Sequence, residues 1–424
     1  MTWQPGVKAD WVIEANRGER PEYLPAPEPF DAGELIEAAT ARRRETGGLP
    51  DDQSLETVLE PLNVFCLALE SEANLTPLGR WATQRYLNRL LDERLALDAL
   101  ATRSEVADEQ VAAPIFVIGP PRSGTTVMHR LLSSDPAHRA TEGWEVLFPS
   151  RARIAHPVEA DDDTRAMAAE ELGFPQSVAQ GIRAIHTYSA TMPKECLSAM
   201  AFSFRTEEFI SRYHVPSYVE WLQAADMSTA YAKHHLVLRV LQSRSTAPHP
   251  RWVLKSPVHL QSLPELAAAY PDARLVVTHR EPADVLASVS SLIANLRSAF
   301  SDTVDAKAVG RYHLDLYGRS LSALDDRLDG LFDPSRVVHV HHADITQDPA
   351  NVIGFIYDQL GLAMTNDASQ AIQAVIANKR EDTLGAHRYD TADFGFASDE
   401  VEQEFASYRT RFLCADGGSA PAAG

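Results

Sequence analysis

The chain contains four short runs of mainly apolar residues, at positions 114–118, 252–254, 275–278 and 337–340. Runs of this length without polar alternation are typical of strands buried on both faces of a parallel sheet. Segments with helical spacing separate them, such as residues 282–296, where Pro282 suits a first helical turn. We therefore predict an α/β fold with three layers, in which helices flank a central, mainly parallel sheet. A ligand is expected at the carboxyl ends of the strands.

The remaining regions favour helices. Leu87, Leu90, Leu91 and Leu95 form one apolar stripe at helical spacing, so a helical extension is expected before the first strand. The stretch of about 150–250 is predicted to be a helical insertion in the α/β domain. We divide the chain into an N-terminal arm with the helical extension (1–104), the α/β domain (105–414) and a disordered tail (415–424).

Charge and composition limit the partners and the compartment. The 39 basic and 59 acidic residues give a net charge of −20, which disfavours nucleic acid and anionic membranes as partners. Three widely spaced cysteines are typical of reduced thiols. The sequence shows no signal-peptide pattern and no run of about 18 apolar residues, so we expect a cytoplasmic protein without an integral membrane segment. Whether it forms a homo-oligomer is left open.

A glycine-containing loop follows the first predicted strand. It reads Gly-Pro-Pro-Arg-Ser-Gly-Thr-Thr from Gly119 to Thr126, and apolar residues at helical spacing come next. A loop at such a junction can direct backbone N–H groups and a helix N-terminus at an anion. The glycine spacing matches a P-loop, but Thr125 stands where a P-loop has lysine, and Arg122 is the only cation. The segment therefore predicts an anion site without the usual parts of a magnesium-dependent nucleotide hydrolase.

A second candidate anchor follows the third predicted strand. Arg280 stands at the carboxyl end of this strand, and Ser288 comes eight residues later in the predicted helix. A guanidinium and a hydroxyl so placed can hold one phosphate. An ion pair between Arg280 and Asp284 on the helix surface is the simpler alternative for this arginine alone.

The two anchors together resemble the family of sulfotransferases that use 3′-phosphoadenosine 5′-phosphosulfate (PAPS), in its bacterial branch. This resemblance implies a P-loop-like fold and PAPS as co-substrate, with no metal. It implies that Arg280 and Ser288 bind the 3′-phosphate of PAPS, and that the 5′-phosphosulfate is held by the loop residues Arg122, Ser123, Gly124, Thr125 and Thr126. A late segment, residues 385–395, is similar to the family's nucleotide-covering loop. It suggests Arg388 as a further 3′-phosphate ligand, with Arg380 as the alternative.

The acceptor hydroxyl needs a base, and two residues are candidates. His259 follows Lys255 after the second predicted strand, and the segment resembles the family stretch in which a lysine and a histidine line the acceptor site. An imidazole has a suitable unperturbed pKa for this role. Glu142 follows the phosphate loop at roughly the distance at which some sulfotransferases carry a catalytic glutamate. A buried structural histidine and a helix cap are the simpler interpretations of the two residues.

The predicted function is sulfuryl transfer from PAPS to an acceptor hydroxyl, with Arg122 at the leaving phosphate. The acceptor is a small molecule, a lipid or a carbohydrate. Aromatic residues of the insertion favour a partly apolar one: Tyr188, Phe202, Phe204, Phe209, Tyr213 and Tyr218. The alternatives are a P-loop kinase or nucleotide hydrolase, which needs ATP and magnesium, and a binding protein that senses adenosine bisphosphate without turnover.

Overall fold

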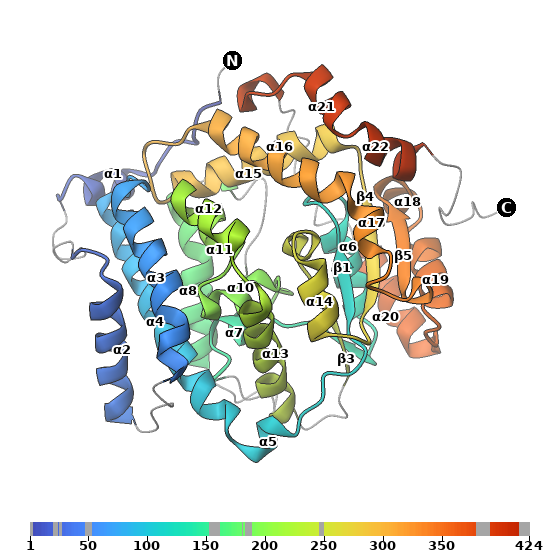
Figure 1. Cartoon of the computed structure of the whole chain (residues 1–424), viewed down its shortest axis with the longest axis horizontal. Helices are drawn as coiled ribbons and strands as arrows, with labels where there is room; N and C mark the ends of the chain where they lie inside the picture. Colours follow the sequence, from blue (N-terminus) through green and yellow to red (C-terminus); the bar gives the residue numbers. More distant parts are fainter. Residues whose placement is uncertain are drawn as a thin grey trace.

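The computed structural model contains a five-stranded parallel sheet, which lies to the right of the centre in Figure 1. Its strands follow the order β2-β3-β1-β4-β5. The structure describes residues 3–19, 24, 28–46, 53–151, 162–179, 181–182, 189–245, 250–378 and 391–414. The strands are β1 (Ile115–Ile118), β2 (His138–Arg139), β3 (Arg251–Lys255), β4 (Arg274–His279) and β5 (Val337–His341). The four predicted strands are confirmed, and the two-residue β2 was not predicted because it is too short to show a pattern.

The two faces of the sheet are covered by different helices, which gives the three predicted layers. Ile115 and Val117 pack into one apolar cluster with α6 (Thr125–Ser133), α18 (His342–Gln347), α19 (Pro349–Gln359) and α20 (Asn366–Ala377). The alternate residues Phe116 and Ile118 belong to a larger cluster on the opposite face. Side chains of a strand point alternately to its two faces, so this division follows directly from the apolar run. The α/β fold is therefore confirmed.

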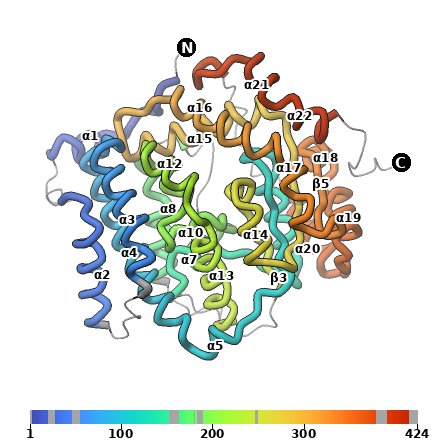
Figure 2. The backbone as a smooth tube through the Cα atoms, viewed as in Figure 1, coloured from blue at the N-terminus to red at the C-terminus, as the bar shows by residue number. Residues whose placement is uncertain are grey.

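The larger cluster joins the sheet to two groups of helices. The backbones of these helices lie beside one another in Figure 2. The extension contains α1 (Asp10–Asn16), α2 (Ala32–Thr46), α3 (Gln53–Ser71), α4 (Pro77–Ala101) and α5 (Ser104–Ala107). The insertion contains α7 (Gly143–Leu147), α8 (Asp162–Val178), α10 (Leu197–Met200), α11 (Glu207–Arg212), α12 (Pro216–Ala224) and α13 (Ser228–Ser243). Leu87, Leu90, Leu91 and Leu95 of α4 are fully buried, as their spacing predicts. Extension and insertion thus share one core.

The second half of the chain closes the fold around the sheet. Its helices are α14 (Leu263–Ala269), α15 (Pro282–Ser298), α16 (Ala306–Ser322), α17 (Leu324–Leu328), α21 (Ser398–Glu404) and α22 (Ala406–Tyr408). Short 3₁₀ turns cover Pro257–Leu260 after β3 and Thr391–Phe394 before α21. The long helices α15 and α16 cross the top of the molecule in Figure 1, next to the insertion helix α12. Within the described ranges, we find no helix long and apolar enough to cross a membrane.

Candidate active site

The glycine-containing loop connects β1 to α6 through an unusual backbone. Gly119 and Gly124 have φ angles of 146° and 97°, where a side chain is disfavoured. A Cβ atom on Gly124 would lie only 2.9 Å from Cδ1 of Ile345. Arg122 also has a positive φ, of 67°. The loop therefore curls tightly into the N-terminus of α6, which is the geometry that presents backbone N–H groups to an anion.

The three hydroxyl residues of the loop have different environments. Ser123 is fully buried, and its Oγ lies 2.6 Å from the Pro120 carbonyl oxygen and 2.5 Å from Thr278 Oγ1 of β4. Thr125 is also buried in the first turn of α6, whereas Thr126 is exposed and lines a cavity. Ser123 thus fixes the loop to the neighbouring strand, and Thr126 presents its side chain to the cavity.

Arg280 brings the second anchor to the first. Its Nη1 donates a hydrogen bond of 2.8 Å to the carbonyl oxygen of Arg122, and its Nη2 lies 3.3 Å from Asp284 Oδ2. The two arginines, 158 residues apart, therefore meet at the carboxyl edge of β1 and β4. Ser288 lies two turns into α15, where it is buried, and among the described residues no hydrogen bond ties it to Arg280. The structure brings the arginines together, but gives no contact of Ser288 with them.

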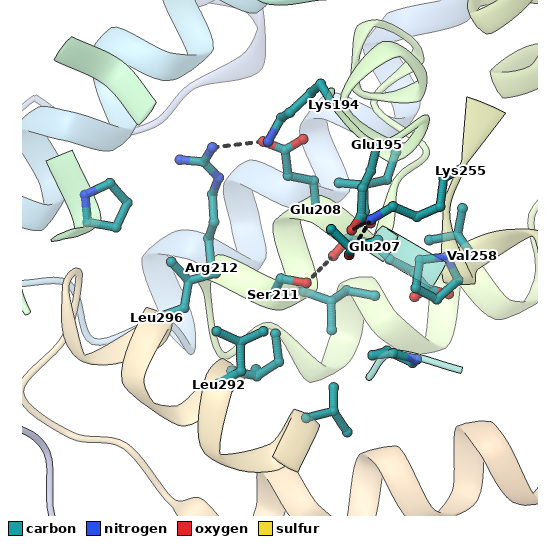
Figure 3. A pocket seen from close by; sticks show the side chains of 18 of the residues that line it. Lys194, Glu195, Glu207, Glu208, Ser211, Arg212, Lys255, Val258, Leu292 and Leu296 are labelled. Carbon is teal, nitrogen blue, oxygen red and sulfur yellow. Dashed lines mark hydrogen bonds and ion pairs between the residues drawn. The ribbon is translucent and has the colours of Figure 1, made fainter. Parts of the chain in front are cut away.

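A cavity of about 190 Å³ opens beside the loop. Pro121 and Thr126 of the glycine-containing loop line one end of it, and Lys255 at the carboxyl end of β3 lies next to them. The opposite wall is mostly aliphatic and comes from α15, α16 and α8, including Leu172, Val289, Leu292, Ile293, Leu296 and Leu316. Figure 3 shows Leu292 and Leu296 facing a row of charged residues across this space. The cavity therefore joins the glycine-containing loop to an apolar chamber.

Lys255 and Glu195 form an ion pair in this cavity (Figure 3). Lys255 Nζ also lies 3.5 Å from Thr126 Oγ1, so the pair stands directly beside the phosphate loop. The Lys255 side chain is 5% exposed and that of Glu195 is 27% exposed, which leaves the carboxylate accessible from the cavity. Glu195 was not predicted from the sequence. The available signal was weak: two adjacent charges, Lys194 and Glu195, within the otherwise apolar stretch 192–197.

Glu208 is a second carboxylate of the cavity wall, and its hydrogen bonds are satisfied. Arg212 Nη2 donates to Glu208 Oε1 at 2.7 Å, and Ser198 Oγ donates to Oε2 at 2.5 Å. Burial opposes ionisation of this carboxyl, but the charges of Arg212 and Lys194 and the two hydrogen bonds hold its pKa down to about 2. Glu208 is therefore a permanent anion that supports the wall of the cavity, and a poor proton acceptor.

His259, a candidate base, points into the core. It is fully buried, its Nδ1 lies 2.7 Å from the hydroxyl of Tyr231, and its ring meets Phe116 edge-on at 5.0 Å. Burial lowers the pKa of His259 to about 3. The described lining of the cavity contains its neighbours Pro257 and Val258 but not this histidine. The structural interpretation of His259 is therefore favoured over a catalytic one.

Glu142, the other candidate base, caps α7. Glu142 is the N-cap residue of α7, and Glu145 Oε2 accepts a hydrogen bond of 2.9 Å from the Glu142 N–H. Glu142 Oε2 accepts a hydrogen bond of 2.6 Å from Trp144 Nε1. Glu142 is absent from the described residues that line the cavity. The geometry thus supports the capping interpretation.

Several other predicted residues lie elsewhere. Arg380, Arg388 and Tyr188 are outside the described residues. The remaining aromatic residues of the insertion, Phe202, Phe204, Phe209, Tyr213 and Tyr218, are almost completely buried and belong to the core. Within the described ranges, no group of three or more His, Cys, Asp or Glu side chains is arranged to hold a metal.

Comparison with known sequences identifies related proteins. Residues 114–366, more than half of the chain, match the sequence profile of the sulfotransferase family. The chain is 27% identical over 274 residues to the omega-hydroxy-beta-dihydromenaquinone-9 sulfotransferases Stf3 of Mycobacterium bovis and Mycobacterium tuberculosis. This alignment covers 61% of the present chain and 65% of each relative, so it spans slightly less than two thirds of their length.

Two solved structures are similar over most of the chain. The sulfotransferase STF1 from Mycobacterium tuberculosis superposes with a TM-score of 0.74 and 28% identity, covering 90% of this chain and 99% of that one. The sulfotransferase STF9 from Mycobacterium avium gives a TM-score of 0.76 and 25% identity, covering 90% of this chain and 97% of that one. Both similarities extend well beyond the loop and Arg280, and include helical regions on either side of β1.

Proposed function

Because this chain belongs to the sulfotransferase family, we propose that it transfers a sulfuryl group from PAPS to an acceptor hydroxyl. The observation that carries this proposal is the contact between the two anchors. Arg280 donates a hydrogen bond to the backbone of Arg122 at the point where the loop turns toward α6. The Arg280 guanidinium, the backbone of the loop and the N-terminus of α6 thus meet at one place, and Pro121 and Thr126 of the same loop line a cavity large enough for an acceptor group. Such convergence suits a ligand with two phosphate groups.

The loop fits a phosphosulfate. A Cβ atom on Gly124 would come within 2.9 Å of the end of the Ile345 side chain, and the φ of 97° at Gly124 suits a chain that curls toward an anion at the start of α6. Arg122, Gly124, Thr125 and Thr126 would hold the 5′-phosphosulfate, with Ser123 fixing the loop against Thr278. Arg280 would hold the 3′-phosphate, and Ser288 and Arg388 remain proposed ligands there. PAPS supplies an activated sulfuryl group on a phosphate leaving group, and Arg122 neutralises charge on that phosphate.

Glu195 is the base in this proposal. Its carboxylate lines the cavity beside Thr126 and Lys255, where an acceptor hydroxyl entering from the apolar side must approach the loop. The ion pair with Lys255 fixes the orientation of the carboxylate, which accepts the proton of the hydroxyl as its oxygen attacks sulfur. Lys255 also places a positive charge next to the loop, where it stabilises negative charge in the transition state. His259 and Glu142 do not share this position.

An apolar acceptor fits the opposite wall of the cavity. Leu292, Ile293 and Leu296 of α15 present only hydrocarbon, so a lipid or another apolar molecule with a terminal hydroxyl gains contact area there. The name of the mycobacterial relatives Stf3 gives a hydroxylated menaquinone as the acceptor of those proteins. We propose a lipid-like hydroxyl as the acceptor class of this chain as well.

Transfer of labelled sulfate tests the proposal directly. The purified protein is incubated with sulfur-labelled PAPS and a panel of long-chain primary alcohols and prenyl alcohols, and organic-soluble label is measured. Label in the organic phase that depends on Arg122 supports sulfuryl transfer. Binding of adenosine 3′,5′-bisphosphate without any transfer would favour a non-catalytic sensor, and release of phosphate from Mg-ATP would favour the kinase or hydrolase alternative.

A further inference from the structure

A second cavity, of about 420 Å³, lies next to the active-site cavity of about 190 Å³. It is bounded by the insertion helix α12, by the segment that follows β3, and by α16. The two cavities share a wall of residues from α11, the 3₁₀ turn after β3, and α16: Glu207, Ile210, Val258, Tyr312 and Leu316. None of the residues described as lining the second cavity belongs to the phosphate loop. This cavity can therefore hold only the part of an acceptor that does not react.

Of the described residues that line both cavities, Glu207 is the one with an ionisable carboxyl group. Its side chain is partly exposed and lines both cavities, near Glu195 in Figure 3. Among the described residues, no donor forms a hydrogen bond with its carboxyl group and no cation pairs with it. Burial, together with the negative charge of Glu195, raises the pKa of Glu207 to about 7.

The adjacent residue Glu208 provides a direct contrast. Both glutamates start the same short helix, α11, but Glu208 has two partners at hydrogen-bond distance whereas Glu207 has none within the described ranges. A polar group inside a protein is normally satisfied, because leaving it without a partner costs free energy. The rest of the shared wall offers three aliphatic side chains and the phenol of Tyr312. A partly exposed carboxyl between two cavities, without a partner among the described residues, is therefore suited to a partner that arrives with a ligand.

We propose that the two cavities form one acceptor site, in which Glu207 accepts a hydrogen bond from a hydroxyl of the acceptor remote from the reacting hydroxyl. This inference rests on the proposed sulfuryl transfer and adds a specificity-determining residue to it. The reacting hydroxyl lies beside Glu195 in the first cavity, a second hydroxyl is bound at Glu207, and the remaining part of the molecule occupies the second cavity. The acceptor class is thus an elongated apolar molecule that carries two hydroxyl groups.

The far end of the second cavity is consistent with an open-ended site. Gln223 of α12 and Arg319 of α16 line it and are both exposed, so the cavity reaches solvent there. Between this mouth and Glu207 the lining includes the apolar residues Val219, Leu222 and Met227. A long acceptor can therefore bury its apolar part along these residues while its far end reaches water.

Diols of graded length test this assignment. Linear α,ω-diols and the matching primary alcohols are titrated calorimetrically into the protein saturated with adenosine 3′,5′-bisphosphate. For the native chain, the diol whose second hydroxyl reaches Glu207 should bind more tightly than its matching alcohol, by about tenfold or more in Kd. Shorter and longer diols should bind no more tightly than their matching alcohols. In Glu207→Leu this length-specific preference should disappear, and in Glu207→Gln, which keeps a carbonyl acceptor, it should be partly retained. If the native chain binds the diol and the matching alcohol with equal affinity at every length, the proposal is overturned.

Filling the second cavity gives an independent test. Val219→Trp, and the more exposed Gln223→Trp as a second variant, should raise the Kd of long alcohols and diols about tenfold while short alcohols and the bisphosphate bind as before. Met364→Trp is the matched control, because Met364 is 41% exposed and lies between α19 and α20, away from both cavities. Unchanged affinity for long ligands in both cavity variants would contradict a continuous site. Failure to bind the bisphosphate in the native chain would instead refute the proposed function itself.

Discussion

The donor side and the acceptor side of the cavity are built in opposite ways. The proposed donor side is a continuous segment, Gly119 to Thr126, and the distant residue Arg280 is joined to it by a hydrogen bond. The acceptor side takes single residues from α8, the segment before α10, α11, α15 and α16. Backbone geometry dominates the first side, whereas side-chain identity and burial dominate the second. Substitutions on the two sides should therefore affect different measurable quantities.

The largest effect is expected from Glu195→Gln. The glutamine keeps the size of the side chain but cannot accept the proton, so kcat should fall by about 10²–10⁴-fold. Affinity for adenosine 3′,5′-bisphosphate should be unchanged, because Glu195 lies on the acceptor side of the loop. Glu142→Gln is the matched control and should retain kcat within a few-fold. A normal rate in Glu195→Gln would remove this residue from the mechanism.

His259→Ala separates stability from catalysis. Removing this buried ring leaves a cavity beside Phe116 and deprives Tyr231 of its partner, so the free energy of unfolding should fall by about 2–4 kcal/mol. The kcat of the protein that remains folded should stay within a few-fold of the native value. Denaturant unfolding and initial rates measured on the same preparation check both parts. A loss of kcat beyond a hundredfold in folded protein would restore His259 as the base.

Arg280→Ala is expected to act on the donor side alone. Loss of a guanidinium hydrogen bond to a charged group should weaken binding of adenosine 3′,5′-bisphosphate by about 1.5–3 kcal/mol, roughly ten- to hundredfold in Kd. Affinity for apolar alcohols should not change, since Arg280 does not line the described acceptor cavity. Asp284→Ala serves as the control, because it removes the ion-pair partner of Arg280 but leaves the guanidinium in place. An equal loss in both variants would point to a structural role of the ion pair.

The smallest expected effect is a pH dependence of stability at Glu207. Its pKa in the folded protein is raised from 4.5 to about 7, so the unfolded chain loses this proton at lower pH than the folded one. The contribution of the neutral carboxyl to stability is fully present below about pH 4.5 and is lost as the pH rises through 7. Between pH 5 and pH 8, the free energy of unfolding of Glu207→Gln should therefore increase by about 1 kcal/mol relative to that of the native chain. Unfolding curves of both proteins at pH 5 and pH 8 check this. A difference in the free energy of unfolding that is the same at both pH values would argue against a raised pKa of Glu207.

The contrast between one continuous loop and a wall assembled from distant residues also explains how much of the molecule could be predicted from its sequence. The four longer strands and the loop were predictable because apolar runs and glycine spacing are local patterns. Arg280 was predictable because it directly follows such an apolar run. Glu195 was not, because its partner Lys255 is 60 residues away and only the folded chain brings them together. His259 illustrates the limit. It stands four residues after Lys255, but the 3₁₀ turn directs its ring into the core and leaves Lys255 in the cavity.

A calorimetric titration with adenosine 3′,5′-bisphosphate tests the central claim most directly, with ADP and Mg-ATP as competitors for the same site. The bisphosphate should bind at least tenfold more tightly than either competitor, and Arg280→Ala should remove most of this preference, because the 3′-phosphate is the group that only the bisphosphate carries. Tighter binding of Mg-ATP, or a bisphosphate affinity that does not depend on Arg280, would contradict the assignment of a PAPS site to this loop.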